Sequence, residues 1–294
     1  MAVKSTARQR FREILGRSGC TQAASIFDPL SARIASLQGW ELCKLSGSVG
    51  KFSNLAVPDD IPMANMSDLV DLCWRINRVC DACLVVDADD GGGSALNVFR
   101  TVRELEAAGV AAIEIEDNTV PQRFGVAQRR HEMIVSQEEQ VGKLCAAVEA
   151  RQDCSTAIVA RTSALNELPR DDAMRRISAY SATGVDAIML PGMAHGRSDI
   201  EAAMQATDLP LLLLRIPEDV LGDTDFLERA RVRVRYQESI LYSIVVKAMD
   251  DCLRHLQNGG TAAELADRTA EARLLRSVDR TYDMQAWQDK YVRG

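Results

Sequence analysis

The chain has 294 residues, of which 47% are hydrophobic and 26% charged, and its net charge is −7. This length is enough for one large α/β domain or two small ones with a sizeable core. The acidic balance, without any Lys/Arg-rich tract, argues against a nucleic-acid-binding protein. No apolar run reaches the roughly 18 residues that a membrane span needs, and no secretory h-region is visible. We therefore expect a cytoplasmic protein that does not bind membranes.

Short aliphatic and β-branched runs alternate along the chain with longer amphipathic segments. The predicted strands are 22–27, 42–46, 82–88, 111–117, 156–162, 186–191, 210–215 and 231–236. The predicted helices are 28–39, 94–109, 136–152, 170–184 and 240–256. Asp28 and Ser136 are good N-caps, and Gly109 suits a C-cap. Eight strands alternating with helices favour an α/β (β/α)₈ TIM barrel, with an open doubly wound sheet as the alternative.

The end of the chain differs from the repeating part. We expect residues 1–257 to form the barrel, as the catalytic domain, and residues 258–294 to form a C-terminal helical arm. This segment is polar and helix-prone, with Trp287 and Tyr291 near its end. Exposed aromatic side chains on such an arm often pack on a partner subunit, so we expect a homo-oligomer.

Polar residues gather where the predicted strands end. They are Ser46, Gly47, Ser48, Asp87, Asp89, Glu116, Asp117 and Arg161. In a barrel the carboxyl ends of the strands meet at the active-site face. Carboxylates as close as those of VVDADDGGG, residues 85–93, repel one another unless solvent, a helix N-terminus or a cation offsets their charge.

These residue types together suit a small dianionic acid. Several carboxylates around one opening favour Mg²⁺ or Mn²⁺. The segment 46–48 can offer N–H groups and hydroxyls to an oxyanion, and Arg161 can hold a carboxylate in bidentate fashion. The alternative is that residues 87–90 form a solvated turn before a helix that begins at Ser94. The residues alone leave both readings open.

In their order and spacing, several motifs resemble the isocitrate lyase/phosphoenolpyruvate mutase superfamily over roughly residues 10–257. The matching segments are FDPLSARIA (27–35), LSGSVG (45–50), DADDGGGSALNV (87–98), IEIEDNTVPQRFG (113–125), SQEEQVGKL (136–144) and IVARTSA (158–164). Within the superfamily the chain is most similar to the oxaloacetate decarboxylase family, which carries a similar SV-containing oxyanion segment and a similar QFG loop.

The resemblance implies a barrel whose C-terminal helix is swapped between the subunits of a dimer or tetramer. It implies Mg²⁺ held by Asp87, with Asp89 and Glu116 acting through bound water. An α-keto acid would chelate this metal through its carboxylate and keto oxygens. The implied substrate-binding residues are Ser46, Gly47, Ser48 and Arg161, and the implied catalytic residues are Asp87, Arg161 and Ser48.

Two segments depart from the pattern of these families. The lyases carry a KKCGH or KRCGH loop whose Cys serves as acid/base, but this chain has QRFGV at 122–126, with Phe124 in place of the Cys. The decarboxylases carry a substrate-binding His in a VNGH-like segment near the last strand, where this chain has Ser239, with Gln237 close by. Gln237 or Ser239 can donate a hydrogen bond to the substrate, but neither can carry a histidine's positive charge. Either the substrate differs or decarboxylation is weak.

We therefore expect a Mg²⁺-dependent decarboxylase of oxaloacetate or a related β-keto dicarboxylic acid, a carbon–carbon lyase. Loss of CO₂ leaves an enolate whose charge the metal stabilises. No protein base is needed to start this reaction, and water or Tyr236 would supply the final proton.

Two alternatives stay open. The first is a C–C or C–P lyase of altered specificity that uses Glu114 or a metal-bound water as its base. Glu114 would share a strand face with Glu116, and it could instead form a structural salt bridge. The second is a non-catalytic binding protein that keeps the metal and dianion site. His195, after the sixth predicted strand, is interpreted as structural.

Overall fold

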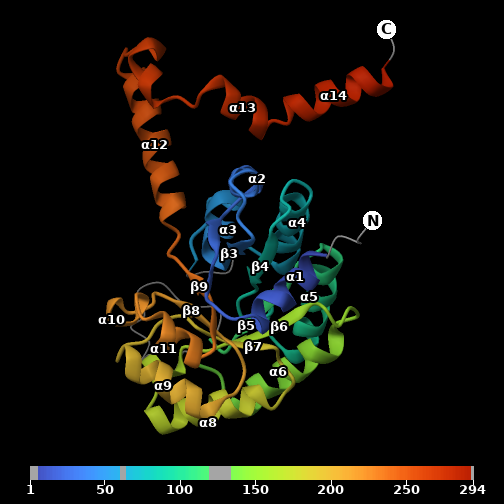
Figure 1. Ribbon diagram of the computed structural model, residues 1–294, viewed down its shortest axis with the longest axis vertical. Coiled ribbons are helices and arrows are strands. Elements are labelled where there is room, and N and C mark those ends of the chain that lie inside the picture. Colours follow the sequence, from blue (N-terminus) through green and yellow to red (C-terminus); the bar gives the residue numbers. More distant parts are fainter. Residues whose placement is uncertain (1–5, 60–63, 119–133, 293–294) are drawn as a thin grey trace.

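The computed structural model describes residues 6–59, 64–118 and 134–292. Nine parallel strand segments form a nearly closed barrel with helices around it (Figure 1). The strands are β1 (Thr21–Gln22), β2 (Ala24–Ile26), β3 (Leu42–Leu45), β4 (Cys83–Asp87), β5 (Ala112–Glu116), β6 (Ala157–Arg161), β7 (Ala187–Leu190), β8 (Leu211–Leu214) and β9 (Val232–Tyr236). The predicted α/β barrel is confirmed.

The first predicted strand explains why nine segments appear where eight were expected. It divides at Ala23 into β1 and β2. β1 pairs with β9, whereas β2 pairs with β3. The backbone N–H of Ala23 donates to the carbonyl oxygen of Arg235 over 3.1 Å, so the chain stays bonded to β9 at the break. One short stretch of chain therefore joins both edges of the sheet.

The helices lie where the amphipathic segments predicted them, with several that the sequence analysis did not predict. They are α1 (Ala7–Gly16), α2 (Pro29–Leu37), α3 (Gly47–Leu55), α4 (Met66–Asn77), α5 (Ala95–Ala107), α6 (Gln137–Ala150), α7 (Ala164–Glu167), α8 (Arg170–Ser181), α9 (Arg197–Ala206), α10 (Glu218–Leu221), α11 (Thr224–Arg229), α12 (Ile240–Gln257), the 3₁₀ helix η2 (Ala262–Arg268), α13 (Ala272–Val278) and α14 (Thr281–Tyr291). The predicted N-caps are confirmed, because Asp28 and Ser136 each accept a hydrogen bond from the backbone three residues on.

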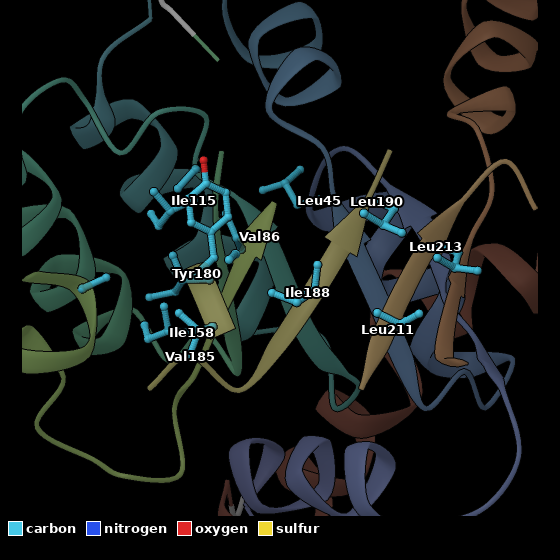
Figure 2. Packing of buried hydrophobic residues seen from close by; sticks show 14 of the residues in the cluster. Leu45, Val86, Ile115, Ile158, Tyr180, Val185, Ile188, Leu190, Leu211 and Leu213 are labelled. Atoms are coloured by element: carbon cyan, nitrogen blue, oxygen red, sulfur yellow. The ribbon is translucent and has the colours of Figure 1, made fainter. Parts of the chain in front are cut away.

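The strands separate two apolar cores. The outer core lies between the sheet and the helices and includes Val86, Ile115 and Ile158. Figure 2 shows the ring of Tyr180, from α8, beside these three side chains. Because strands such as β7 (AIML) and β8 (LLLL) are covered on both faces, their sequences read as continuous apolar runs rather than as an alternation.

The second core lies inside the barrel and extends from the end where the strands begin up to Tyr236, the last residue of β9. Phe11 and Ile14 of α1 are fully buried there, in one cluster with Leu42 and Cys83. The charged face of α1 is tied to the same end of the barrel, because Arg8 pairs with Asp153 over 2.9 Å. Helix α1 therefore closes the amino end of the barrel.

The C-terminal helices leave the barrel. Helix α12 projects away from it, and α13 and α14 continue beyond (Figure 1). Helix α12 has no buried residue, and Ile244, Met249 and Leu253 are each more than half exposed. A hydrogen bond of 3.2 Å from Arg33 of α2 to the carbonyl oxygen of Ser277 holds α13 near the barrel. No described helix is long and apolar enough to cross a membrane.

Candidate active site

A cavity of about 370 Å³ opens at the carboxyl ends of the strands. Six of the predicted site residues line it: Ser46, Ser48, Asp87, Arg161, Gln237 and Ser239. They come from the ends of β4 and β6, from the start of α3 after β3 and from the segment that follows β9. The structure therefore brings together residues that are far apart in the sequence, at the face where barrel enzymes carry their active sites.

Arg161 joins the two predicted carboxylates beside it. Asp87, Glu116 and Arg161 are the last residues of β4, β5 and β6. The guanidinium of Arg161 pairs with Asp87, and its Nε lies 3.0 Å from Oε2 of Glu116. Asp87 and Glu116 are both buried. The side chain predicted to bind a substrate carboxylate thus neutralises protein carboxylates in this structure.

Asp89 lies in a strained backbone conformation next to this trio. Its φ of 48° is in the left-handed region, which non-glycine residues rarely adopt. Its carbonyl oxygen accepts a hydrogen bond of 2.9 Å from the N–H of Glu116. Its carboxylate lies 2.8 Å from Nζ of Lys51, on α3. Lys51 was not predicted from the sequence, although it follows Ser48 by three residues and so lies on the same face of a helix.

The segment 46–48 is the start of helix α3 and not a simple turn. Ser46 is the N-cap residue but makes no side-chain cap bond, and its Oγ lies 3.0 Å from Oγ of Ser48 instead. The N–H groups of the first turn therefore lack this side-chain cap and can serve an anion. Gly47 is required here, because an added Cβ would lie 2.5 Å from Oδ1 of Asp89.

The carboxylates of Asp87, Asp89 and Glu116 differ in pKa because their electrostatic environments differ. Burial alone would raise the pKa of Asp87, but Arg161 and Lys44 outweigh it and lower this pKa to about 2. Burial, together with the charge of Asp87, raises the pKa of Asp89 to about 6. Burial also raises the pKa of Glu116 to about 8, against the opposing effect of Arg161. The carboxylates still repel one another, so a further cation would be favourable.

The carboxylates fit a hydrated Mg²⁺ better than a fully protein-bound ion. In the ranges that the structure describes, no three His, Cys, Asp or Glu side chains converge to surround a metal. Mg²⁺ commonly keeps several waters and takes one or two carboxylates directly. The buried Oε2 of Glu116 accepts no hydrogen bond from the described residues, although it faces Arg161. Hard oxygens with spare capacity are the donor set that Mg²⁺ or Mn²⁺ prefers.

A charged layer lies directly below these residues inside the barrel. Lys44 of β3 forms an ion pair with Glu114 of β5. Nζ of Lys44 also lies 5.0 Å from the centre of the Tyr236 ring, on β9. Of the two roles left open for Glu114, the contact fits the structural salt bridge. The sequence analysis missed Lys44, whose only signal is a lysine within the apolar run LCKLS.

Several other candidates lie away from the cavity. Asp117 points to the outer layer, where it accepts hydrogen bonds of 2.7 Å from Thr162 and 2.9 Å from Tyr180. His195 is exposed, and its backbone N–H donates to Asp199 over 2.8 Å. The segment QRFGV, 122–126, lies outside the described residues.

Gln237 and Ser239 lie at the rim of the cavity. Gln237 is exposed, and Oγ of Ser239 lies 3.4 Å from Oγ of Ser25. Both side chains line the cavity. Their hydrogen bonds to a substrate stay a prediction.

The barrel and its strand-end site define an enzyme of the isocitrate lyase/phosphoenolpyruvate mutase superfamily. Residues 11–257 match the family described as phosphoenolpyruvate phosphomutase, so the chain belongs to that family. The resemblance drawn from the motifs is confirmed.

Known relatives match almost the whole chain. An oxaloacetate decarboxylase of Paraburkholderia xenovorans (strain LB400) is 37% identical, over 99% of this chain and 95% of that protein. One of Chromohalobacter salexigens is 42% identical over 88% of each. Among solved structures, a phosphonopyruvate hydrolase in complex with oxalate and Mg²⁺ is 27% identical with a TM-score of 0.83, covering 98% of this chain and all of that one.

Proposed function

We propose that this protein is a Mg²⁺-dependent carbon–carbon lyase that decarboxylates oxaloacetate or a related β-keto dicarboxylic acid. One observation carries the proposal: a single cavity combines the start of helix α3, the carboxylate of Asp87 and the guanidinium of Arg161. Phe124 stands where the lyases carry their acid/base cysteine, and decarboxylation needs no such base to begin. The identity to oxaloacetate decarboxylases supports the same reaction.

Each residue would have a defined role. Asp87 would hold Mg²⁺, with Asp89 and Glu116 contributing through water, and the bound ion would act as a Lewis acid for the charge that develops as CO₂ leaves. Backbone and hydroxyl donors of residues 46–48 would bind the substrate oxyanion, as a helix N-terminus does. Arg161 would bind a substrate carboxylate.

The remaining groups would act at the other end of the substrate and on the last proton. Gln237 and Ser239 would hydrogen-bond its distal end from the rim. Burial, with the nearby Glu114, raises the pKa of Tyr236 well above its ordinary value, so this hydroxyl keeps its proton. Tyr236 or water would then protonate the enolate.

Similarity to the phosphonopyruvate hydrolase favours one alternative, cleavage of a C–P bond. In that reading Glu114 was the candidate base. Its side chain is fully buried and paired with Lys44, and it is not among the described residues that line the cavity. A water molecule would then have to serve as the base.

Release of pyruvate from oxaloacetate in the presence of Mg²⁺ tests the proposal, with wild type beside Asp87→Ala. The blank must contain Mg²⁺, because the free ion also promotes this decarboxylation. We expect a rate well above the blank that the variant and EDTA both abolish. A wild-type rate equal to the blank would refute decarboxylation of oxaloacetate, and release of phosphate from phosphonopyruvate would then support the alternative.

We also propose that residues 1–257 act as the catalytic domain and that residues 258–294 pack on another copy of the chain, in a dimer or tetramer. The exposed apolar residues of α13 and α14, among them Leu275, Trp287 and Tyr291, support this arrangement, because such side chains are rarely left in water. Light scattering would give an oligomer for the wild type and a smaller species for Trp287→Lys. A monomeric wild type would contradict the proposal.

A further inference from the structure

Inside the barrel, the layer of side chains just below the strand-end site carries a charged pair, Lys44 and Glu114. Lys44 lies two residues before Ser46, and Glu114 lies two before Glu116, so both side chains point into the barrel below the strand-end site. In the sheet register Lys44 lies beside Val85, and Glu114 lies between Asp87 and Val159. Lys44 is 6% exposed and Glu114 is 0% exposed.

A buried ion pair at this depth is not explained by stability. Taking two charges out of water costs several kcal/mol, and apolar replacements of such pairs are often neutral or stabilising. A cluster of buried apolar side chains, which includes Leu42, Cys83 and Val85, fills much of the same interior. The pair therefore calls for a role in the cavity above it.

Lys44 faces that cavity, whereas Glu114 lies behind it. Lys44 and Tyr236 line the cavity together with Ser46 and Asp87. Within the described structure Nζ of Lys44 is buried and donates no geometrically acceptable hydrogen bond, although Glu114 pairs with it. An ammonium group has three N–H donors, so donors remain for a ligand. The charge of Lys44 also reaches the site, because it helps to lower the pKa of Asp87.

The charges around the cavity oppose an anion unless a metal is present. When all are ionised, the carboxylates of Asp59, Asp87, Asp89, Glu114 and Glu116 exceed the three cations Lys44, Lys51 and Arg161 by two negative charges. A divalent cation neutralises this excess, and without Lys44 one negative charge would remain. Lys51 pairs with both Asp59 and Asp89, and Arg161 pairs with both Asp87 and Glu116. Lys44 pairs with one carboxylate, that of Glu114.

We propose that Lys44 is a substrate-binding residue whose ammonium donates to an oxygen of the metal-chelating acid from the floor of the cavity. Glu114 and the ring of Tyr236 are positioning residues that hold the ammonium in place. The ligand class is a small dicarboxylate or keto acid that binds together with Mg²⁺. This inference rests on the metal and dianion site of the proposed function, but not on the decarboxylation step.

The test measures binding of oxalate in the presence of Mg²⁺ by titration calorimetry on the full chain. The informative variant is Lys44→Met combined with Glu114→Gln, because it removes both members of the pair and leaves no orphaned buried charge. The matched control is Glu114→Gln alone, which keeps the ammonium. Thermal melts would verify that both variants fold.

We expect the double variant to bind oxalate at least about tenfold more weakly than wild type, the effect of one charge-assisted hydrogen bond. Its affinity for Mg²⁺ alone should change by less than about threefold, because the pair carries no net charge. Glu114→Gln keeps the ammonium and removes only a group that positions it, so it should weaken oxalate binding by less than about threefold.

Wild-type affinity for oxalate in the double variant would overturn the inference and make Lys44 a counter-ion of Glu114 only. Absence of oxalate binding to the Mg²⁺-loaded wild type would also overturn it. If oxalate binding follows the expected pattern but oxaloacetate is not turned over, the role of Lys44 stands and the proposed decarboxylation falls.

Discussion

The lower and upper halves of the barrel interior are built from the same strands but have opposite chemistry. On β3, Leu42 belongs to the lower apolar cluster, whereas Lys44 is charged. On β4, Cys83 lies in the lower cluster, whereas Asp87 pairs with Arg161. On each of these strands, a residue that packs in the apolar cluster and a charged residue of the site are therefore only two to four positions apart. This division of labour between the two ends is general in barrel enzymes.

The two halves also differ in what they contribute to stability. The lower half buries aromatic and aliphatic side chains such as Phe11, Ile14 and Leu42. The upper half holds buried ion pairs and the strained backbone of Asp89, both of which cost folding free energy. Substitutions in the lower half should therefore reduce stability and spare activity, whereas those in the upper half should mainly reduce activity.

The largest effect on stability should come from Phe11→Ala, in helix α1 at the amino end of the barrel. Loss of a fully buried ring leaves a cavity, so we expect a loss of about 3–5 kcal/mol in the free energy of unfolding. Urea denaturation measures it, with Leu96→Ala as control, because Leu96 is 84% exposed. The kcat of the folded fraction should stay within about twofold of wild type. A large fall in kcat would show that the two halves are not independent.

Arg161→Met should have the largest effect on activity. It removes the counter-ion of Asp87 and Glu116 and the proposed ligand of the substrate carboxylate. We expect kcat/KM for oxaloacetate to fall about 10²- to 10³-fold, typical of a lost electrostatic contact at a reacting centre. Arg100→Met, on the exposed face of α5, is the control. Retained activity in Arg161→Met would remove Arg161 from the proposed site.

Gly47→Ala should have an intermediate effect on both quantities. The added methyl would lie 2.5 Å from Oδ1 of Asp89, so we expect a loss of about 1–3 kcal/mol and a clear fall in kcat. Gly50→Ala, three residues on in the same helix, is the matched control. There the nearest atom to an added Cβ is Cδ2 of Leu72, at an ordinary 3.5 Å. Equal behaviour of the two variants would contradict the close approach of Asp89 to α3.

The smallest effect should come from His195→Ala. This side chain is 69% exposed and lies outside the cavity-lining residues. Substitutions of exposed residues away from such features change stability by less than about 0.5 kcal/mol. Steady-state assays and thermal melts should both give wild-type values. A drop in kcat would show that the cavity extends further than its described lining.

Much of the site could be predicted because parallel strands place their carboxyl ends at one face. Asp87, Glu116 and Arg161 end three consecutive strands, so locating the strands was enough to bring these residues together. Strand periodicity also indicated that Glu114 and Glu116 share a face. It separates Asp117 from them as well, since adjacent residues point to opposite sides. The prediction that Asp117 belongs with the site residues overlooked this alternation.

The features that were missed depend on local geometry or on partners distant in sequence. Nothing in SGSVG required a helix to begin at Ser46, because glycine and serine suit turns equally well. Lys51 gained meaning only once that helix turned it toward Asp89. Lys44 looked like an interruption of an apolar strand until Glu114, on another strand, lay beside it.

The sequence by itself determined the alternation of strands and helices, the caps at Asp28 and Ser136, and the order of polar residues along the chain. These follow from propensity, periodicity and short-range hydrogen bonds, which involve neighbouring residues. Tertiary structure alone decided which charges meet: Arg161 with Asp87 and Glu116, Lys51 with Asp89, and Lys44 with Glu114. The physical reason is that Coulomb interactions and desolvation depend on distances in space and on burial. Those distances and that burial exist only after the barrel has closed.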